Sequence, residues 1–231
     1  MVIKMLRKLE KRDCGINMKI VPYGGGWTDV YLNIGGDDLY FIISYAFENS
    51  FTDLLGVLYY LHPENSDPEN GDKYVEWWCG LLENDEVVKI VEQAEGSCSV
   101  MPIPKKGEFT WDEEGAYSNW VIERDATTDS DFNIKISIDV YRKEYKHYEY
   151  SVRYKDLCYA VAKACTEVLK SHGIYGYHCS VYDDDMHLRY LLFLKSVALD
   201  NFEARELTDM GEKNGEASSF EKELELLLFD M

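Results

Sequence analysis

The sequence predicts an α+β fold, with a mostly antiparallel sheet and about three to five helices packed on one of its faces. Residues 107–154 hold four consecutive strand patterns, and this strand-after-strand order argues against a wholly doubly wound parallel sheet. Apolar and polar residues alternate over 134–140 and again over 147–154, as half-buried strands require because successive side chains point to opposite faces. From Asp156 to about Ser171 the apolar period becomes that of a helix.

The first quarter of the chain predicts three strands and a helix, separated by glycine turns. Strands are expected over 17–23, 27–34 and 39–46, and the last is so apolar that it is placed in the interior of the sheet. Three glycines follow the first strand and two follow the second, where glycine supplies the positive φ of a tight turn. They lack the spacing and the lysine of a phosphate-binding loop, so a plain turn is favoured. Ser50 and Asp53 then form a capping box that opens a helix.

A tryptophan pair stands between this helix and the meander. Trp77 and Trp78 lie in the stretch 74–82, and a helix is expected over 85–93. Adjacent indole rings can offer a stacking platform to a base or a sugar, or they can form a packing layer in the core. The pair is therefore a candidate binding feature with a structural alternative.

The last third of the chain predicts two helices after an irregular stretch. Residues 174–182 are aromatic without a regular period, and a strongly apolar helix follows over 186–198. The C-terminal helix, 218–231, can dock on its own domain or on a partner; its own domain is favoured, since helices gain most stability from packing their apolar face. Its expected inner face is formed by Phe220, Leu224, Leu227 and Leu228.

Two stretches, 27–61 and 133–170, repeat the order strand, tight turn, strand, helix. In both, an aromatic residue stands three positions before a leucine at the helix start, and an aspartate stands directly before that leucine. One interpretation is a degenerate duplication, with half-repeats 17–100 and 107–200; the other is two ordinary helix entries. The chain is treated as one globular domain, 1–231; if the repeat is real, a groove between the halves is the expected place for a ligand.

The chain is strongly acidic. It holds 43 Asp and Glu residues against 24 Lys and Arg residues, which gives a net charge of −19. Phosphate contacts need Lys and Arg, so this charge argues against a nucleic-acid partner, and an anionic membrane surface is disfavoured for the same reason. A basic protein would be attracted and steered by the charge. The alternative is that the acidity serves solubility alone.

Two acidic clusters are candidate sites. Three consecutive aspartates, 183–185, precede an expected helix close to His187; they can bind a hard cation through oxygen or cap the helix. Three carboxylates at 112–114 end the first meander strand, where they can serve acid–base chemistry or form a solvated hairpin turn. Together with the tryptophan pair, the candidate binding residues are Trp77, Trp78, Asp112, Glu113, Glu114, Asp183, Asp184 and Asp185.

The six cysteines predict neither a zinc knuckle nor a redox motif, because no pair has the required two-residue spacing. Cys158 and Cys165 are seven residues apart on an expected helix and are assigned to the core as small apolar residues. The charged N-terminus does not resemble a secretory signal, and no apolar run approaches the length of a membrane span. The expected location is a reducing cytoplasm.

These patterns lead to three functional hypotheses. The first is a non-enzymatic cytoplasmic protein, monomer or homodimer, that binds another protein with a basic surface; its most concrete form is an immunity or antitoxin-like inhibitor of a bacterial toxin. The second is a metal-dependent hydrolase that uses the Asp183–Asp185 cluster and His187. The third is a self-associating structural module held by Trp77, Trp78 and the last helix. No catalytic residue, metal ligand or cofactor is assigned, and no nucleophile-elbow motif is present.

Overall fold

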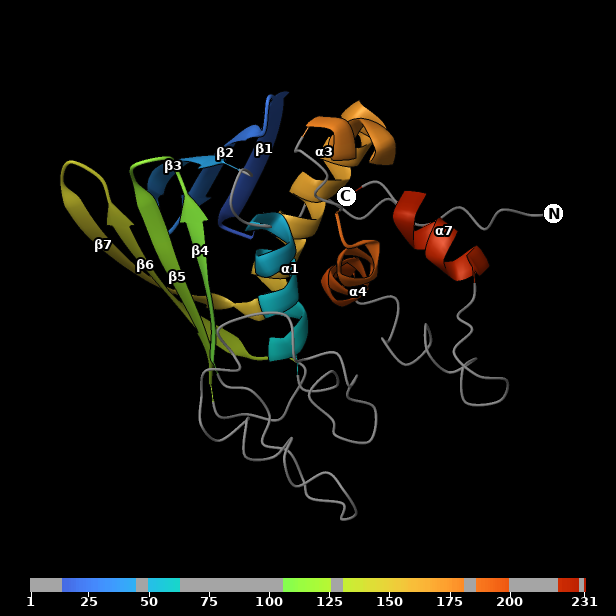
Figure 1. The fold of residues 1–231 in the computed structure, drawn as a ribbon. Helices are drawn as coiled ribbons and strands as arrows, with labels where there is room; N and C mark the ends of the chain where they lie inside the picture. Colours follow the sequence, from blue (N-terminus) through green and yellow to red (C-terminus); the bar gives the residue numbers. More distant parts are fainter. Residues whose placement is uncertain are drawn as a thin grey trace, which may run out of the picture.

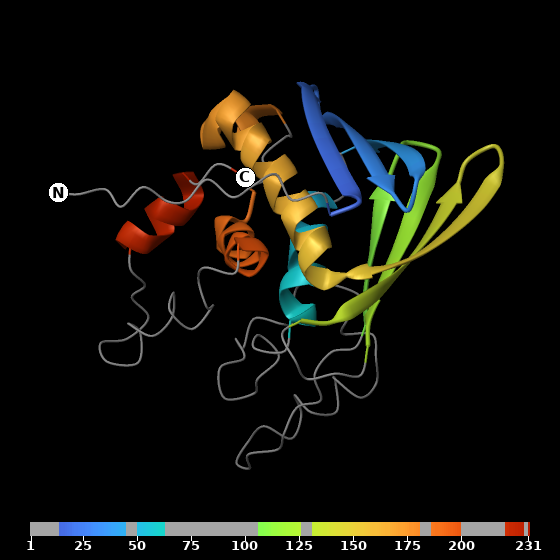
Figure 2. The same cartoon turned by 180° about the vertical axis from the view of Figure 1, so that it is seen from behind.

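Two antiparallel sheets and four helices make up the part of the chain that the computed structural model describes (Figure 1). The sheets lie on one side of the molecule and the helices on the other, in the front and the back views alike (Figures 1 and 2). The α+β prediction is confirmed, with the strands divided between two sheets. The described residues are 14–44, 50–62, 106–125, 131–180, 186–199, 220–228 and 231.

Sheet A has three strands. They are β1 (Ile16–Gly24), β2 (Trp27–Ile34) and β3 (Asp37–Ser44), in that order across the sheet. Gly35 and Gly36 form the turn between β2 and β3 with φ of 61° and 90°, a left-handed conformation that glycine adopts without steric cost. The prediction that the apolar strand at 39–46 lies inside a sheet is wrong, because β3 is an edge strand of sheet A. Its apolar side chains are buried against sheet B instead.

Sheet B is the four-stranded meander predicted from the sequence. Its strands are β4 (Lys106–Asp112), β5 (Tyr117–Arg124), β6 (Asn133–Tyr141) and β7 (Tyr145–Arg153), each antiparallel to the next. The predicted alternation in β6 is confirmed, since every second residue from Ile134 to Val140 is buried. β7 is an edge strand in which no residue is buried.

Four helices accompany the sheets in the described ranges. They are α1 (Ser50–Leu61), α3 (Tyr154–Ser180), α4 (Leu188–Leu199) and α7 (Phe220–Leu228). The prediction of an irregular stretch after Gly173 is wrong for residues 174–180, which are helical. Gly173 has a φ of 72° and a ψ of 169°, so it kinks α3, and a second helical segment begins after it. Within the described residues, no helix combines the length and the hydrophobicity that a membrane crossing needs.

Each sheet packs against the helix that follows the other sheet. α1 follows sheet A in the sequence and packs on β4, whereas α3 follows sheet B and packs on β1 (Figures 1 and 2). Gly107 permits the close approach of α1, because a Cβ atom at this position would lie 2.4 Å from Cγ1 of Val57. Phe51 and Tyr154, the aromatic residues at the two helix starts, are both buried. The repeated element order is thus observed, while duplication as its origin remains a prediction.

One hydrophobic core joins the inner faces of both sheets to α1, α3 and α4. The ring of Phe41 in β3 has its centroid 5.3 Å from those of Trp111 and Trp120 in sheet B. Cys158 and Cys165 are buried on α3 as predicted. Burial raises the pKa of Cys165 to about 12, so this thiol stays protonated and packs as an apolar group.

The C-terminal helix α7 packs against α4. Lys195 Nζ donates a hydrogen bond to the carbonyl oxygen of Leu227 over 3.2 Å, and Leu226 is fully buried. The predicted inner face of this helix is wrong at Leu224 and Leu228, which are exposed. Consecutive leucines make several rotations of the helix equally apolar in sequence, so the contact with α4 decides which leucine is buried.

Candidate functional site

The acidic turn at 112–114 joins β4 to β5, and its three carboxylates have separate contacts. Asp112 Oδ1 accepts a hydrogen bond from the backbone N–H of Glu114 over 2.6 Å, as an Asx turn requires. Glu113 accepts two hydrogen bonds from Arg142 over 2.8 and 2.9 Å, and only 6% of its side chain is exposed. Glu114 accepts a hydrogen bond from Ser44 Oγ over 3.1 Å. Asp112 therefore shapes the turn, Glu113 ties it to the β6–β7 hairpin, and Glu114 ties it to the end of β3 in sheet A.

Five predicted site residues lie outside the described residues, so their roles remain predictions. They are Trp77, Trp78, Asp183, Asp184 and Asp185. His187 stacks on Tyr190, with 5.3 Å between the ring centroids. In the described ranges, no three His, Cys, Asp or Glu side chains gather in a way that could hold a metal ion. The hydrolase hypothesis gains no support from this part of the chain.

His62 is a histidine of the core. It is 3% exposed, and its ring lies 5.8 Å from that of Tyr154 and 5.1 Å from that of Phe193. Burial, together with the nearby Arg124 guanidinium, lowers the pKa of His62 to about 4. Its imidazole is therefore neutral at neutral pH and contributes packing to the core.

Six tyrosines expose their rings on the outer faces of the two sheets, away from the helices. They are Tyr23, Tyr31 and Tyr40 in sheet A and Tyr117, Tyr141 and Tyr145 in sheet B. The three in sheet B are direct cross-strand neighbours on β5, β6 and β7, and we name them the tyrosine row. Ring centroids in the row are 4.5 Å apart for Tyr117 and Tyr141, and 5.3 Å apart for Tyr141 and Tyr145.

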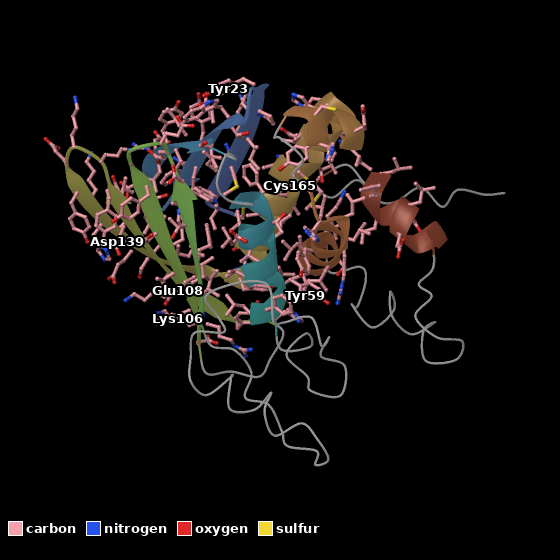
Figure 3. The ribbon with its side chains drawn as sticks, viewed as in Figure 1. Tyr23, Tyr59, Lys106, Glu108, Asp139 and Cys165 are labelled. Atoms are coloured by element: carbon pink, nitrogen blue, oxygen red, sulfur yellow. The ribbon has the colours of Figure 1, made fainter. Side chains whose placement is uncertain are left out.

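Asp139 lies in the adjacent cross-strand row, on the same face and away from the helices (Figure 3). Its Oδ1 accepts a hydrogen bond from the Tyr145 hydroxyl over 2.6 Å and lies 2.8 Å from His147 Nδ1. These two hydrogen bonds lower the pKa of Asp139, and the bond to Asp139 raises the pKa of Tyr145 to about 12. At neutral pH the site thus pairs an ionised carboxylate with a protonated phenol.

His147 connects Asp139 to a second carboxylate. Its Nε2 lies 3.6 Å from Glu149, which also pairs with Lys135 over 2.8 Å. The hydrogen bond to Asp139, with a further contribution from Glu149, raises the pKa of His147. The pair with Lys135 lowers the pKa of Glu149. All these side chains are at least a quarter exposed, so solvent and salt screen their mutual attraction.

The end of sheet B that carries the tyrosine row is acidic. Asp112 continues the row on β4, opposite Tyr117, so one of the three predicted turn carboxylates does reach this face. Glu108 and Glu149 lie four residues from the row along the edge strands β4 and β7. The lysines of this face, Lys106 and Lys135, stand at its opposite end, each across from Glu123. Lys106 pairs with Glu108 and Lys135 pairs with Glu149, so among the described residues of this face the carboxylates that accompany the tyrosine row without a lysine partner are Asp112 and Asp139.

The outer face of sheet A repeats part of this arrangement. Asp29 on the middle strand accepts hydrogen bonds from Tyr40 over 2.9 Å at Oδ1 and from Tyr31 over 3.4 Å at Oδ2. Partial burial, with the bond to Asp29, raises the pKa of Tyr40 to about 12. Lys19 on β1 stands opposite Tyr31, with Nζ 5.9 Å from the ring centroid. Sheet A thus places its own cation on its aromatic surface.

An open groove of about 570 Å³ lies between the two sheets, where the sequence repeat led us to expect a ligand. It is lined by residues 38–41 of β3 and by the β6–β7 hairpin. Arg142, Lys143 and Lys146 outnumber the two carboxylates of the lining, Asp38 and Glu144. The groove therefore lacks the acidic character of the outer face of sheet B, and Arg142 spans it to donate a hydrogen bond to the Tyr40 carbonyl oxygen over 2.7 Å.

The tyrosines, Asp139 and His147 were not predicted as site residues from the sequence. A usable signal was present, because the tripeptide Asp-Val-Tyr occurs at 29–31 and again at 139–141, each time in an interior strand of a sheet. Alternation assigns the aspartate and the tyrosine to the same outer face. Which residues stand beside them is a matter of strand register, which the sequence alone does not give.

Comparison of the chain with protein-family models, with curated proteins and with solved structures gave no match.

Proposed function

We propose that this chain is a non-enzymatic binding protein whose target is another protein with a basic surface. The observation that carries the proposal is the exposed tyrosine row beside Asp139 on the outer face of sheet B. Tyrosine is enriched at protein interfaces because its ring buries a large area with few rotatable bonds. The neighbouring carboxylates complement positive charge on a partner.

This surface is smaller than the area that a stable protein interface buries on each partner. Three cross-strand rows over four strands cover an area on the order of 400 Å², from the ordinary spacing of strands and residues. A stable interface buries about 800 Å² on each partner. The acidic end of sheet B thus provides about half of a standard contact, and further parts of the chain must supply the remainder.

The distribution of charge indicates where long-range attraction arises. The described residues hold 19 of the 43 acidic side chains and 14 of the 24 basic ones, so their net charge is −5 of the total −19. Most of the acidic excess therefore belongs to segments outside the described residues. We infer that the total charge increases the rate of association with a cationic partner, whereas the tyrosine row provides contacts in the bound complex.

The most concrete form of the proposal is an immunity or antitoxin-like inhibitor that covers the basic surface of a toxin. In that role the acidic protein would block the cationic residues with which the toxin engages its own target. The proposal keeps the cytoplasmic location and the monomeric or homodimeric state expected from the sequence.

The test is binding to the cationic proteins encoded beside this gene, measured by calorimetry with the full chain. We expect a complex that weakens when salt rises from about 0.05 to about 0.5 M, because screening shortens the range of the attraction. Replacing Tyr117, Tyr141 and Tyr145 by Ser should weaken it at least tenfold, on the order of the loss of one interface hot spot. Tyr175→Ser, at an 80% exposed site on α3, is the matched control and should bind normally. Absence of any salt-sensitive complex would contradict the proposal.

A second candidate function, self-association, is favoured by one observation on α7. Leu228 is 70% exposed and Leu224 is 41% exposed, which gives the helix an apolar strip that a second copy can cover. Sedimentation of the full chain over a wide concentration range tests this alternative. A dimer that Leu224→Gln with Leu228→Gln dissociates would support it, and a monomer at every concentration would exclude it.

A further inference from the structure

The two sheets carry the same three-strand pattern around their Asp-Val-Tyr tripeptides. In sheet A the tyrosine opposite Tyr31, which is Tyr40, donates a hydrogen bond to Asp29. In sheet B the tyrosine opposite Tyr141, which is Tyr145, donates a hydrogen bond to Asp139. The aspartate, the tyrosine two residues later and the tyrosine across from it therefore occupy equivalent positions.

The third strand makes the two patterns different. Opposite Tyr31 stands Lys19, whose ammonium lies over the Tyr31 ring. Opposite Tyr141 stands Tyr117, whose ring stacks on Tyr141 at an interplanar angle of 19°. Sheet A thus supplies a cation to its aromatic surface, and the corresponding position of sheet B supplies another aromatic ring.

The two aspartates also differ in how many of their carboxylate oxygens accept a hydrogen bond. Both carboxylate oxygens of Asp29 accept a tyrosine hydroxyl. At Asp139 both contacts fall on Oδ1, and Oδ2 accepts no hydrogen bond from any residue in the described part of the chain. The Asp139 side chain is 28% exposed, so a partner's donor can reach this carboxylate, and Oδ2 keeps its capacity to accept a hydrogen bond.

We propose that the tyrosine row and Asp139 form a recognition site for an arginine side chain of the partner. The guanidinium would stack on an exposed tyrosine ring of the row, a cation–ring contact of the kind that Lys19 makes with Tyr31 in sheet A, and would donate a hydrogen bond to Asp139 Oδ2. Arginine suits this site better than lysine, because its planar group stacks on aromatic rings and presents several donors in a fixed fork. Asp112, at the end of the row, adds a second negative charge.

This inference rests on the proposed function, since it names the group that the partner contributes. The probe is a short blocked peptide with two arginines separated by glycine, compared with its lysine counterpart. Titration is followed through the ring signals of isotope-labelled tyrosines in the full chain. The arginine peptide should shift the tyrosine-row signals in a saturable manner, and the lysine peptide should bind at least about threefold more weakly, since it lacks the planar stack.

Two substitutions test the assignment of the site. Tyr117→Lys gives sheet B the cation that sheet A has in Lys19, and it should weaken the arginine peptide about fivefold, as should Asp139→Asn. Lys19→Tyr removes the cation from sheet A, but both oxygens of Asp29 still accept tyrosine hydroxyls, so arginine-dependent shifts at Tyr31 and Tyr40 should stay weaker than those of the tyrosine row. Thermal unfolding establishes that each variant is folded, and Tyr175→Phe serves as the control that should leave the titration unchanged.

The outcomes separate this inference from the function on which it rests. Equal binding of the arginine and lysine peptides, or an unchanged affinity in folded Tyr117→Lys, overturns the arginine site. If a basic protein still binds through the tyrosine row in that case, the proposed function stands. If the arginine peptide binds the row but no cationic neighbour does, the arginine site is supported and the proposed function is rejected.

Discussion

Sheets A and B bury similar inner faces but present different outer faces. Both contribute large apolar side chains to the one core, where Phe41 of sheet A meets Trp111 and Trp120 of sheet B. On the outside, both oxygens of Asp29 accept tyrosine hydroxyls, whereas Oδ2 of Asp139 accepts no hydrogen bond from the part of the chain that the structure describes. The inner faces are constrained by packing, so they determine the fold. Substitutions on the outer faces change stability little. Single residues there therefore determine whether the acceptors of a carboxylate are used within the chain or left for a partner.

The largest effect should come from the contact that the two inner faces share. Phe41→Ala should lower the free energy of unfolding by about 3 to 5 kcal/mol, because a buried ring is lost and a cavity remains. Tyr40→Ala, on the outer face of the same strand, should cost no more than about 1 kcal/mol, the range of an exposed cross-strand pair. Denaturant unfolding followed by circular dichroism and tryptophan fluorescence measures both. Equal losses for the two variants would remove the distinction between the faces.

The next effect concerns the link between the sheets. Arg142→Ala should cost about 2 kcal/mol, because it leaves the Glu113 carboxylate without its paired cation and frees the Tyr40 carbonyl oxygen. The cost is below that of a fully buried pair, since 37% of the Arg142 side chain is exposed. Lys143→Ala, at the neighbouring exposed residue of the same turn, should change stability by no more than about 0.5 kcal/mol. Thermal and denaturant unfolding of the two variants check the prediction, and an effect of equal size in both would refute it.

A smaller effect is expected on the pKa values of the tyrosines that bind the two aspartates. Asp139→Asn should lower the pKa of Tyr145 from about 12 toward its ordinary value of 10.0, because the main cause of the raised value is the bond to this carboxylate. Asp29→Asn should lower the pKa of Tyr40 only in part, since burial is the first cause there and remains in the variant. Titration of the tyrosine ring carbons by NMR separates the two cases. A Tyr145 pKa that does not move would show that Asp139 is not its partner.

The smallest effect is a pH dependence that only sheet B should show. His147 faces Asp139 on β6 and Glu149 on its own strand, whereas the residue opposite Asp29 in sheet A is Ile42. The folded pKa of His147 is raised, so its stabilising contribution is fully present below its unfolded value of 6.5 and is lost as pH rises through the folded value.

His147→Gln should therefore destabilise the protein at pH 5 to 6 and become indistinguishable from the wild type at high pH, in unfolding experiments at low salt. The contribution of Asp139 has the opposite sign, because its folded pKa is lowered: it is present above the unfolded value of 3.8 and is lost as pH falls through the folded value. A destabilisation by His147→Gln that grows with rising pH would contradict the assignment.

Much of the fold could be predicted from the sequence, because its signals are local. The meander, the first helix and the start of α3 follow from alternation, helical period and caps. The wrong predictions concern features that neighbouring residues do not determine. They are the edge position of β3, the helical turns after Gly173 and the rotation of α7. Each depends on a packing partner distant in the sequence.

Less of the candidate site was predictable. The acidic turn was selected as a cluster in the sequence, yet Glu113 turns toward Arg142, 29 residues away, and only Asp112 joins the outer face of sheet B. The tyrosine row was missed, because Tyr117 and Tyr141 become neighbours only through the register of β5 and β6. A count of carboxylates in sequence finds acidic clusters but gives no information on strand pairing.

The sequence by itself determined which residues face inward on most strands and helices, the positions of the glycine turns and the sign of the net charge. These properties depend on residues close together in the chain and on the fixed geometry of the backbone. Only the tertiary structure decided that the strands divide into two sheets, that each helix packs on the other sheet, and that Lys19 meets Tyr31 while Tyr117 meets Tyr141. Such pairings are selected by the burial of the whole core, a collective quantity that no local stretch of sequence contains.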